Sequence, residues 1–415
     1  MIPNFKSIRV LEIGTAVSVP AMGAVLANLG ADVIKVESRH KLDGNRVRIR
    51  KGGAGNASGG LNSDESFPLW HEFNGGKRSV LLNLKSEVSR KLFIDLIKQC
   101  DLFIQNFAPG WLERLGLSAQ TLLEINPRLV MVFASGYGQA GPKAQQRVYA
   151  PVMTALGGQE ALIGEESGEV MGAMPIAFGD FNAGFHGVFL LFSALYQRET
   201  TDKGCVIDLS QIEAVTATLG EAIVEMQVTG KVPSPTGNRS DYRCPHGVYP
   251  CGGADEWVTL SIGSDEEWAA FIAFVRTTDP VLASQLDAAK WRHAGGRVTD
   301  RLLVDELVAG WTRRFERAEL PGRLQAAGLR SAPVYESDEM EKDDHFRARR
   351  FTHEVEHPRV GRMAVTSTPW LFEGTTPTAR AAGPGLGEST EEVLTALCGL
   401  TAADVELYTK EGHLA

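Results

Sequence analysis

The chain has 415 residues, of which 43% are hydrophobic and 22% are charged, and this composition predicts a folded globular protein. Its net charge of -9 argues against a nucleic-acid partner, because proteins that bind polyanions need a basic face. The sequence lacks an apolar run of about 18 residues, so we expect no membrane span. Five scattered cysteines and a polar, charged start predict a cytoplasmic protein without a disulfide framework.

The first 135 residues alternate between strand and helix patterns. Short β-branched or apolar runs predict strands over 8–13, 31–36, 79–84, 102–105 and 129–134. Amphipathic or capped segments predict helices over 20–29, 86–99 and 118–125, with Ser118 as an N-cap. Strands that are joined through helices form a parallel sheet, so the fold class is α/β. Residues 41–66 are rich in Gly, Ser and Asn and predict a long loop.

The pattern continues with a helix over 182–197, a strand over 206–209 and a helix over 211–226. Pro, Gly and Ser then punctuate residues 231–244 as a linker would. A hairpin over 247–262 and helices over 265–276 and 301–312 follow, then strands in 361–368 and helices over 390–398 and 402–409. We therefore predict a first domain over 1–228, a smaller α+β domain over 229–335, and a return segment over 336–415 that completes the first domain.

Several motifs of known chemistry are missing. Gly14-Thr-Ala-Val-Ser18 follows the first predicted strand without the G-x-G-x-x-G fingerprint, so we expect neither a nicotinamide nor a flavin. The sequence also lacks a phosphate-binding P-loop, a G-x-S-x-G elbow and an H-E-x-x-H pair. Cys244, His246 and Cys251 have no second ligand pair at a suitable spacing, and no metal is expected.

Asp180 is the acidic residue that stands out, within Phe178-Gly-Asp-Phe-Asn182 at the start of an apolar helix. An Asp in this position is most often an N-cap whose side chain accepts from the first free N–H groups of the helix. The other interpretation is a nucleophile, beside which Gly179 would leave backbone N–H groups free to stabilise an oxyanion. The residues alone favour the N-cap.

An ordered set of motifs resembles the family III CoA-transferases, the CaiB–BaiF group. The motifs are Leu26–Glu37, Asn74-Gly-Gly-Lys-Arg78, Asn106-Phe-Ala-Pro-Gly110, Asn126-Pro-Arg-Leu129, Ser135-Gly-Tyr-Gly138, Gly179-Asp180 and Pro384-Gly-Leu-Gly-Glu388. The resemblance implies a Rossmann-like large domain formed by the N- and C-terminal segments, with a smaller α+β domain inserted. It also implies an interlocked dimer, either a homodimer or a heterodimer with a paralogous subunit.

The same resemblance implies that coenzyme A is a substrate and that Asp180 is the catalytic nucleophile. An acyl-CoA such as succinyl-CoA is the expected donor and a second carboxylic acid the acceptor, with an aspartyl anhydride and an aspartyl-CoA thioester between them. Matching positions give the expected CoA-binding residues, namely Ala16, Val17, Ser18, Glu37, Ser38, Arg39, Asn74, Lys77, Asn106, Phe107, Arg114, Arg147 and Tyr149.

The sequence departs from the family pattern at two places. Ala108 stands where the family often has Arg after Asn-Phe, so we expect one phosphate contact of the family to be lost or supplied by another residue. Residues 237–247 lack the run of four glycines of oxalate-specific members and resemble members that act on larger acids, including benzylsuccinate. Two alternatives stay open: a 2-methylacyl-CoA racemase, although Tyr149 stands at the position of its basic His, and a partner subunit of a heteromeric transferase.

Overall fold

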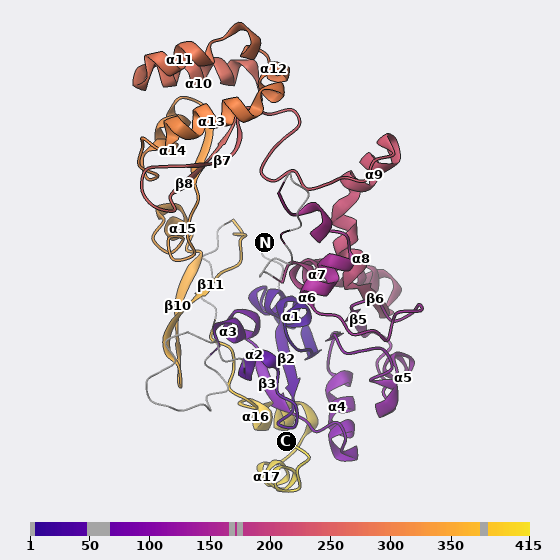
Figure 1. Cartoon of the computed structure of the whole chain (residues 1–415). Coiled ribbons are helices and arrows are strands. Elements are labelled where there is room, and N and C mark those ends of the chain that lie inside the picture. Colours follow the sequence, from indigo (N-terminus) through magenta and orange to yellow (C-terminus); the bar gives the residue numbers. More distant parts are fainter. Residues whose placement is uncertain (1–4, 48–66, 166–170, 172–176, 374–380) are drawn as a thin grey trace. The chain divides into compact units, whose positions relative to one another are not determined.

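The computed structural model describes residues 5–47, 67–165, 171, 177–373 and 381–415 (Figure 1). The chain forms two compact units. The first comprises Met1–Glu160, Ala173–Val232 and Asp344–Ala415, and the second comprises Ala161–Gly172 and Pro233–Asp343. The sequence pattern did not separate the short segment that begins at Ala161 from its neighbours.

A six-stranded parallel sheet lies at the centre of the first unit, in the order β3-β2-β1-β4-β5-β6 (Figure 1). Its strands are β1 (Arg9–Ile13), β2 (Asp32–Glu37), β3 (Arg78–Leu81), β4 (Leu102–Gln105), β5 (Val130–Ser135) and β6 (Cys205–Ser210). The predicted parallel sheet and its α/β class are confirmed. The strands β1 to β3 are added toward one edge of the sheet and β4 to β6 toward the other, so the strand order reverses between β1 and β4. Ligands of such sheets bind outside the carboxyl ends of the strands at that point.

Helices cover both faces of the sheet. On one face lie α1 (Ser18–Asn28) and α7 (Phe178–Thr201), which share a core with alternate strand residues such as Val10. On the other face lie α4 (Glu87–Lys98), α5 (Ala119–Ile125), α16 (Thr390–Cys398) and α17 (Ala402–Lys410), packed with Leu11 and its counterparts. Because successive strand residues point to opposite faces, each strand contributes to both cores.

Helix α1 approaches the sheet closely because Gly23 has no side chain. A Cβ atom at Gly23 would lie 1.9 Å from Glu12 Oε2, on the strand beneath. Glu12 is fully buried in the middle of β1, so the carboxylate occupies the space that a side chain at position 23 would need. This contact fixes the height of α1 above β1.

The remaining elements of the first unit are α2 (Gly44–Val47), α3 (Pro68–Asn74), α6 (Ala150–Leu156), α8 (Gln211–Thr216), α9 (Gly220–Thr229), α15 (Asp344–Ala348) and the antiparallel pair β10 (Thr352–His357) and β11 (Gly361–Thr366). Part of the predicted loop over 41–66 is helical, since α2 lies within it, and 48–66 lie outside the described residues. The helix predicted over 211–226 is divided by a 3-10 turn at Ala217–Leu219.

The second unit contains a three-stranded antiparallel sheet of β7 (His246–Pro250), β8 (Trp257–Ser261) and β9 (Arg330–Pro333). Its helices are α10 (Asp265–Thr278), α11 (Pro280–Leu286), α12 (Ala294–Thr299), α13 (Arg301–Thr312) and α14 (Leu320–Ala326). Buried aromatic side chains, including Trp268, Phe271 and Trp311, form its core. The predicted hairpin and the helices at 265 and 301 are confirmed. Over the part of the chain that the structure describes, no helix is long and apolar enough to span a bilayer.

Candidate active site

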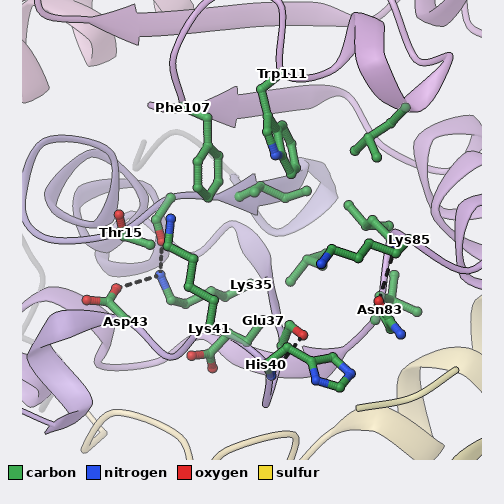
Figure 2. A pocket seen from close by; sticks show the side chains of 17 residues that line it. Thr15, Lys35, Glu37, His40, Lys41, Asp43, Asn83, Lys85, Phe107 and Trp111 are labelled. Carbon is green, nitrogen blue, oxygen red and sulfur yellow. Dashed lines mark hydrogen bonds and ion pairs between the residues drawn. The ribbon is translucent and has the colours of Figure 1, made fainter. Parts of the chain in front are cut away.

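A cavity of about 400 Å³ opens at the carboxyl ends of β1, β2, β3 and β4 (Figure 2). Its walls come from Ile13–Thr15, Lys35–Ser38, His40, Lys41, Asp43, Leu82–Lys85, Phe107, Trp111 and Leu115. This is the carboxyl edge of the sheet beside the neighbouring strands β1 and β4, the position at which parallel sheets of this order bind their ligands. The cavity is the candidate ligand site of the first unit.

Aromatic rings and cationic side chains share this cavity. The rings of Phe107 and Trp111 stack with centroids 4.5 Å apart and planes 22° from parallel. Lys41 Nζ lies 5.7 Å from the Phe107 ring centroid, and His40 and Lys85 lie along the wall (Figure 2). Aromatic faces stack on nucleobases and ammonium groups pair with phosphates, so these walls suit a nucleotide.

The loop after β1 has a fixed conformation. Ala16 has a φ of 63°, which is unusual for a residue with a side chain. Asp43 Oδ1 accepts from the Ala16 N–H at 3.2 Å, and Asn45 Nδ2 donates to the Ala16 carbonyl at 2.6 Å. Lys35 Nζ donates to the Gly14 carbonyl at 2.7 Å. These bonds stabilise the strained loop and hold it at the edge of the cavity.

Asn106, which follows β4, ties this loop to the neighbouring strand. Its Oδ1 atom accepts from the Thr15 N–H at 3.1 Å, and its Nδ2 atom donates to the Thr15 carbonyl at 2.9 Å. The same Nδ2 donates to Ser18 Oγ at 3.1 Å. Asn106 therefore sets the position of Ser18, the first residue of α1.

Asp180 lies inside the first turn of α7, so its interpretation as an N-cap is wrong. The helix begins at Phe178, and no side chain caps its N-terminus. The backbone N–H and the hydroxyl of Ser18 instead donate to the Asp180 carboxylate. Burial raises the pKa of Asp180 to about 6, although both bonds from Ser18 act to lower it. Asp180 is thus a half-buried, anchored carboxylate that is mostly ionised at neutral pH.

With this geometry, the chain can be compared with known proteins. The family model described as CoA-transferase family III matches residues 5–390. The chain belongs to CoA-transferase family III. It is therefore an enzyme that transfers coenzyme A between acids, as the resemblance of its motifs predicts.

Relatives of this family III CoA-transferase match along nearly the whole chain. The beta subunit of succinyl-CoA–L-malate CoA-transferase from Chloroflexus aurantiacus is 31% identical over 95% of this chain and 94% of its own length. The alpha subunit from the same species is 28% identical over 97% and 90%. A solved structure of a CaiB/BaiF family protein from Brucella suis superposes with a TM-score of 0.84 and 26% identity, and the match covers 96% of this chain and all of that one.

Two of the predicted CoA contacts in this transferase, Asn74 and Lys77, are buried and turned away from the cavity wall. Lys77 Nζ lies 2.7 Å from Glu12 Oε2 and donates to Asn74 Oδ1 at 3.1 Å. Lys35 Nζ lies 2.9 Å from the other oxygen of Glu12. Burial lowers the pKa of Lys77 to about 8. Burial also acts to lower the pKa of Lys35, but the nearby carboxylates of Glu12 and Asp43 outweigh it, so this pKa is raised.

Glu37 lines the cavity but is already paired. Arg46 donates to both of its carboxylate oxygens, at 2.9 and 2.7 Å, and stacks 3.6 Å from the Trp70 ring centroid. Ser79 Oγ adds a bond of 2.6 Å. Burial acts to raise the pKa of Glu37, yet the bond and charge of Arg46 outweigh it, so this carboxylate stays ionised. Glu37 shapes the wall as one half of an ion pair.

The other predicted residues divide between the cavity and the surface. Ser38 and Phe107 line the cavity. Ala16 and Val17 belong to the loop beside it, Ser18 begins the helix that follows, and Asn106 bonds to Ser18 from the end of β4. Arg39 and Arg114 are exposed neighbours of wall residues, and Arg147 and Tyr149 are exposed at the start of α6. Trp111, Lys41 and Lys85 also line the cavity, and the sequence motifs did not indicate them. Two of them could have been inferred from the sequence, because Lys85 directly follows a predicted strand and Trp111 lies four residues after Phe107.

Proposed function

We propose that this transferase uses Asp180 as a covalent nucleophile. The observation that carries the proposal is the pair of hydrogen bonds from Ser18 to a half-buried carboxylate whose pKa is raised to about 6. Such a group is ionised at neutral pH and needs no base to activate it. Burial removes part of the hydration that would weaken the carboxylate as a nucleophile.

The proposed reaction is an exchange of acyl links. A carboxylate oxygen of Asp180 attacks the thioester carbonyl of the donor, the C–S bond breaks, and a mixed anhydride forms as CoA thiolate leaves. The thiolate then attacks the aspartyl carbonyl and releases the donor acid, which leaves an aspartyl-CoA thioester. The acceptor acid reverses both steps. Each step exchanges one activated acyl group for another, so no nucleotide is hydrolysed.

We further propose that the cavity at the ends of β1–β4 binds the nucleotide end of CoA, with the base against Phe107 and Trp111 and the phosphates near Lys41 and Lys85. Replacing Trp111→Ala is expected to weaken CoA binding about tenfold or more, because stacking on an aromatic ring contributes roughly 1–3 kcal/mol per base. Titration calorimetry with CoA measures this. Trp257→Ala in the second unit is the matched control, and equal affinities of the two variants would contradict the assignment.

The pH dependence of enzyme–CoA formation should follow Asp180. Only the ionised carboxylate attacks, so the rate is expected to be half-maximal near pH 6, to approach its maximum well above that pH and to fall below it. In Ser18→Ala the loss of the hydroxyl bond, which favours the charged form, is expected to move the midpoint to higher pH. Pre-steady-state rates across pH measure the shift. Ser193→Ala on the outer side of α7 should leave the midpoint unchanged; an unmoved midpoint in Ser18→Ala speaks against this role.

For the substrates, we propose succinyl-CoA as donor and an aromatic or branched dicarboxylate such as benzylsuccinate as acceptor. The names of the malate relatives support the donor, and the residues of 237–247 support the acceptor class. Incubation with panels of acyl-CoAs and acids, with chromatography of the CoA products, tests both. If no succinyl-CoA is consumed with any acid in the panel, the donor is wrong.

A second candidate is a subunit that acts only with a paralogous partner, since two of the relatives are the alpha and beta subunits of one enzyme. The purified chain alone distinguishes the two cases. Transfer by the homomer supports the first candidate, and transfer only after a paralogue is added supports the second. The racemase alternative has no support at Tyr149, which is 75% exposed and therefore unsuited to act as a buried base.

A further inference from the structure

A second cavity, of about 450 Å³, lies between α1, α3, α7 and the segment after β11. Its walls include Ala21 and Val25 of α1, Phe73 of α3, and Phe181 and Phe185 of α7. It is separate from the cavity at the ends of the strands, with which it shares no wall residue. Its size is that of a small-molecule site.

Asp180 faces the start of α1, the helix whose next turn lines the second cavity. Thr15, which precedes α1, lines the first cavity, whereas on α1 itself Ser18 donates to Asp180 and Ala21 lines the second cavity one turn later. On α7, Phe181 follows Asp180 directly and Gly184 lies one turn beyond it on nearly the same face. The second cavity therefore begins within one helical turn of the carboxylate.

The absence of a side chain at Gly184 brings these helices together. A Cβ atom there would lie 3.1 Å from the Ser18 carbonyl oxygen and 3.7 Å from the Ala21 Cβ atom. The close crossing holds the turn of α7 that carries Asp180 next to the residues of α1 that line the cavity. In an acyl-CoA the reactive thioester carbonyl lies between the CoA and the rest of the acyl group. The rest of the acyl group would therefore extend from Asp180 toward the second cavity.

The walls of the second cavity select an apolar group. Among the described residues that line it, none is lysine, arginine or histidine, and the one ionisable side chain is Glu72. Both oxygens of Glu72 accept from Thr366, one from the N–H at 2.9 Å and the other from the hydroxyl at 2.7 Å. A carboxylate placed here would meet a like charge without a cation to pair it, which costs free energy. Aryl and branched alkyl groups avoid that cost.

We infer that this cavity binds the apolar part of the acyl group, as an aryl or branched alkyl substituent, while Asp180 attacks the adjoining carbonyl. The inference rests on the proposed function, because it assigns a role to the space beside the proposed nucleophile. It also explains why Phe185, a large apolar side chain, is 52% exposed on α7 next to the site. A second carboxylate of a dicarboxylic acid would lie outside the cavity.

The test compares CoA transfer to propionate from phenylacetyl-CoA and from acetyl-CoA. For the unmodified enzyme we expect kcat/KM at least about tenfold higher with phenylacetyl-CoA than with acetyl-CoA, within the range that an apolar pocket provides. Val25→Phe fills the cavity and should lower the ratio of phenylacetyl-CoA to acetyl-CoA turnover by about tenfold or more. Val281→Phe, an equal change at an exposed site of α11, should leave the ratio unchanged.

Trp370→Ala, which removes an aromatic wall instead of filling the space, is expected to lower the same ratio and serves if Val25→Phe fails to fold. An unchanged ratio in both variants overturns the inference. So does a change of oligomeric state in Val25→Phe on size-exclusion chromatography, because a second copy of the chain would then cover the cavity. Mass mapping of trapped intermediates is read separately: a label away from Asp180 overturns the proposed nucleophile, whereas the turnover ratio alone judges the cavity.

Discussion

Replacing Asp180→Ala is expected to lower the rate of CoA transfer by at least about a thousandfold, because it removes the group to which the acyl chain and CoA would be linked. Asp180→Asn should be similarly inactive, although its amide oxygen can still accept from Ser18. Rapid-quench kinetics with succinyl-CoA, followed by mass spectrometry of the protein, measures both the rate and the enzyme–CoA thioester.

The control is Asp95→Ala, which removes a carboxylate of α4 that pairs with Lys98 at 2.7 Å on the surface. Its transfer rate should equal that of the unmodified enzyme. Substantial transfer by Asp180→Asn would show that this carboxylate does not become acylated. Hydroxylamine, which cleaves acyl links, should release CoA from the unmodified enzyme and from Asp95→Ala, and from neither Asp180 variant.

The second large effect concerns stability. Glu12→Gln is expected to lower the free energy of unfolding by about 3–5 kcal/mol, the usual cost of removing one partner of a buried ion pair. Glu12 is fully buried and lies 2.9 and 2.7 Å from the ammonium groups of Lys35 and Lys77. Its loss leaves Lys77 without its carboxylate partner and Lys35 with Asp43 alone, at 3.5 Å. Urea denaturation followed by far-UV circular dichroism measures the change.

Glu87→Gln provides the matched comparison, because Glu87 pairs with Lys91 at 2.9 Å on the exposed side of α4. Exposed pairs of this kind contribute at most about 1 kcal/mol. If the two variants lose the same free energy of unfolding, the buried pairs do not hold the first unit together. Adding Lys77→Met to Glu12→Gln should recover part of the loss, since it removes the buried charge that Glu12→Gln leaves without its carboxylate partner.

Much of the fold could be predicted from the sequence because its signals are local. The β-branched runs of β1 and β2, separated by one helix, indicate a parallel pair, and the predicted helices at 301–312 and 390–398 match α13 and α16 residue for residue. The helices that were missed, such as α3 and α11, are short and begin at a proline, where the apolar pattern has too few turns to show. Tertiary packing determines such elements.

The site was less predictable because its contacts join distant segments. Gly179 is a poor helix former, so the pattern suggested that α7 begins after Asp180, whereas packing against α1 extends it to Phe178. Lys77 and Glu12 are 65 residues apart, and nothing near Lys77 indicates a buried partner. The acidic residue inside the apolar run of β1 was the available signal, since an unpaired carboxylate would not be buried there.

The clearance of 1.9 Å between a hypothetical Cβ atom at Gly23 and Glu12 Oε2 also limits how this protein can diverge. Any larger residue at position 23 collides with a carboxylate that two lysines hold in place, so the glycine cannot change while that carboxylate remains. Natural descendants should therefore alter positions 12, 23, 35 and 77 jointly, keeping either the whole charged set with its glycine or an apolar set with a larger residue. These four positions lie far apart within the first 77 residues, yet they are expected to change together.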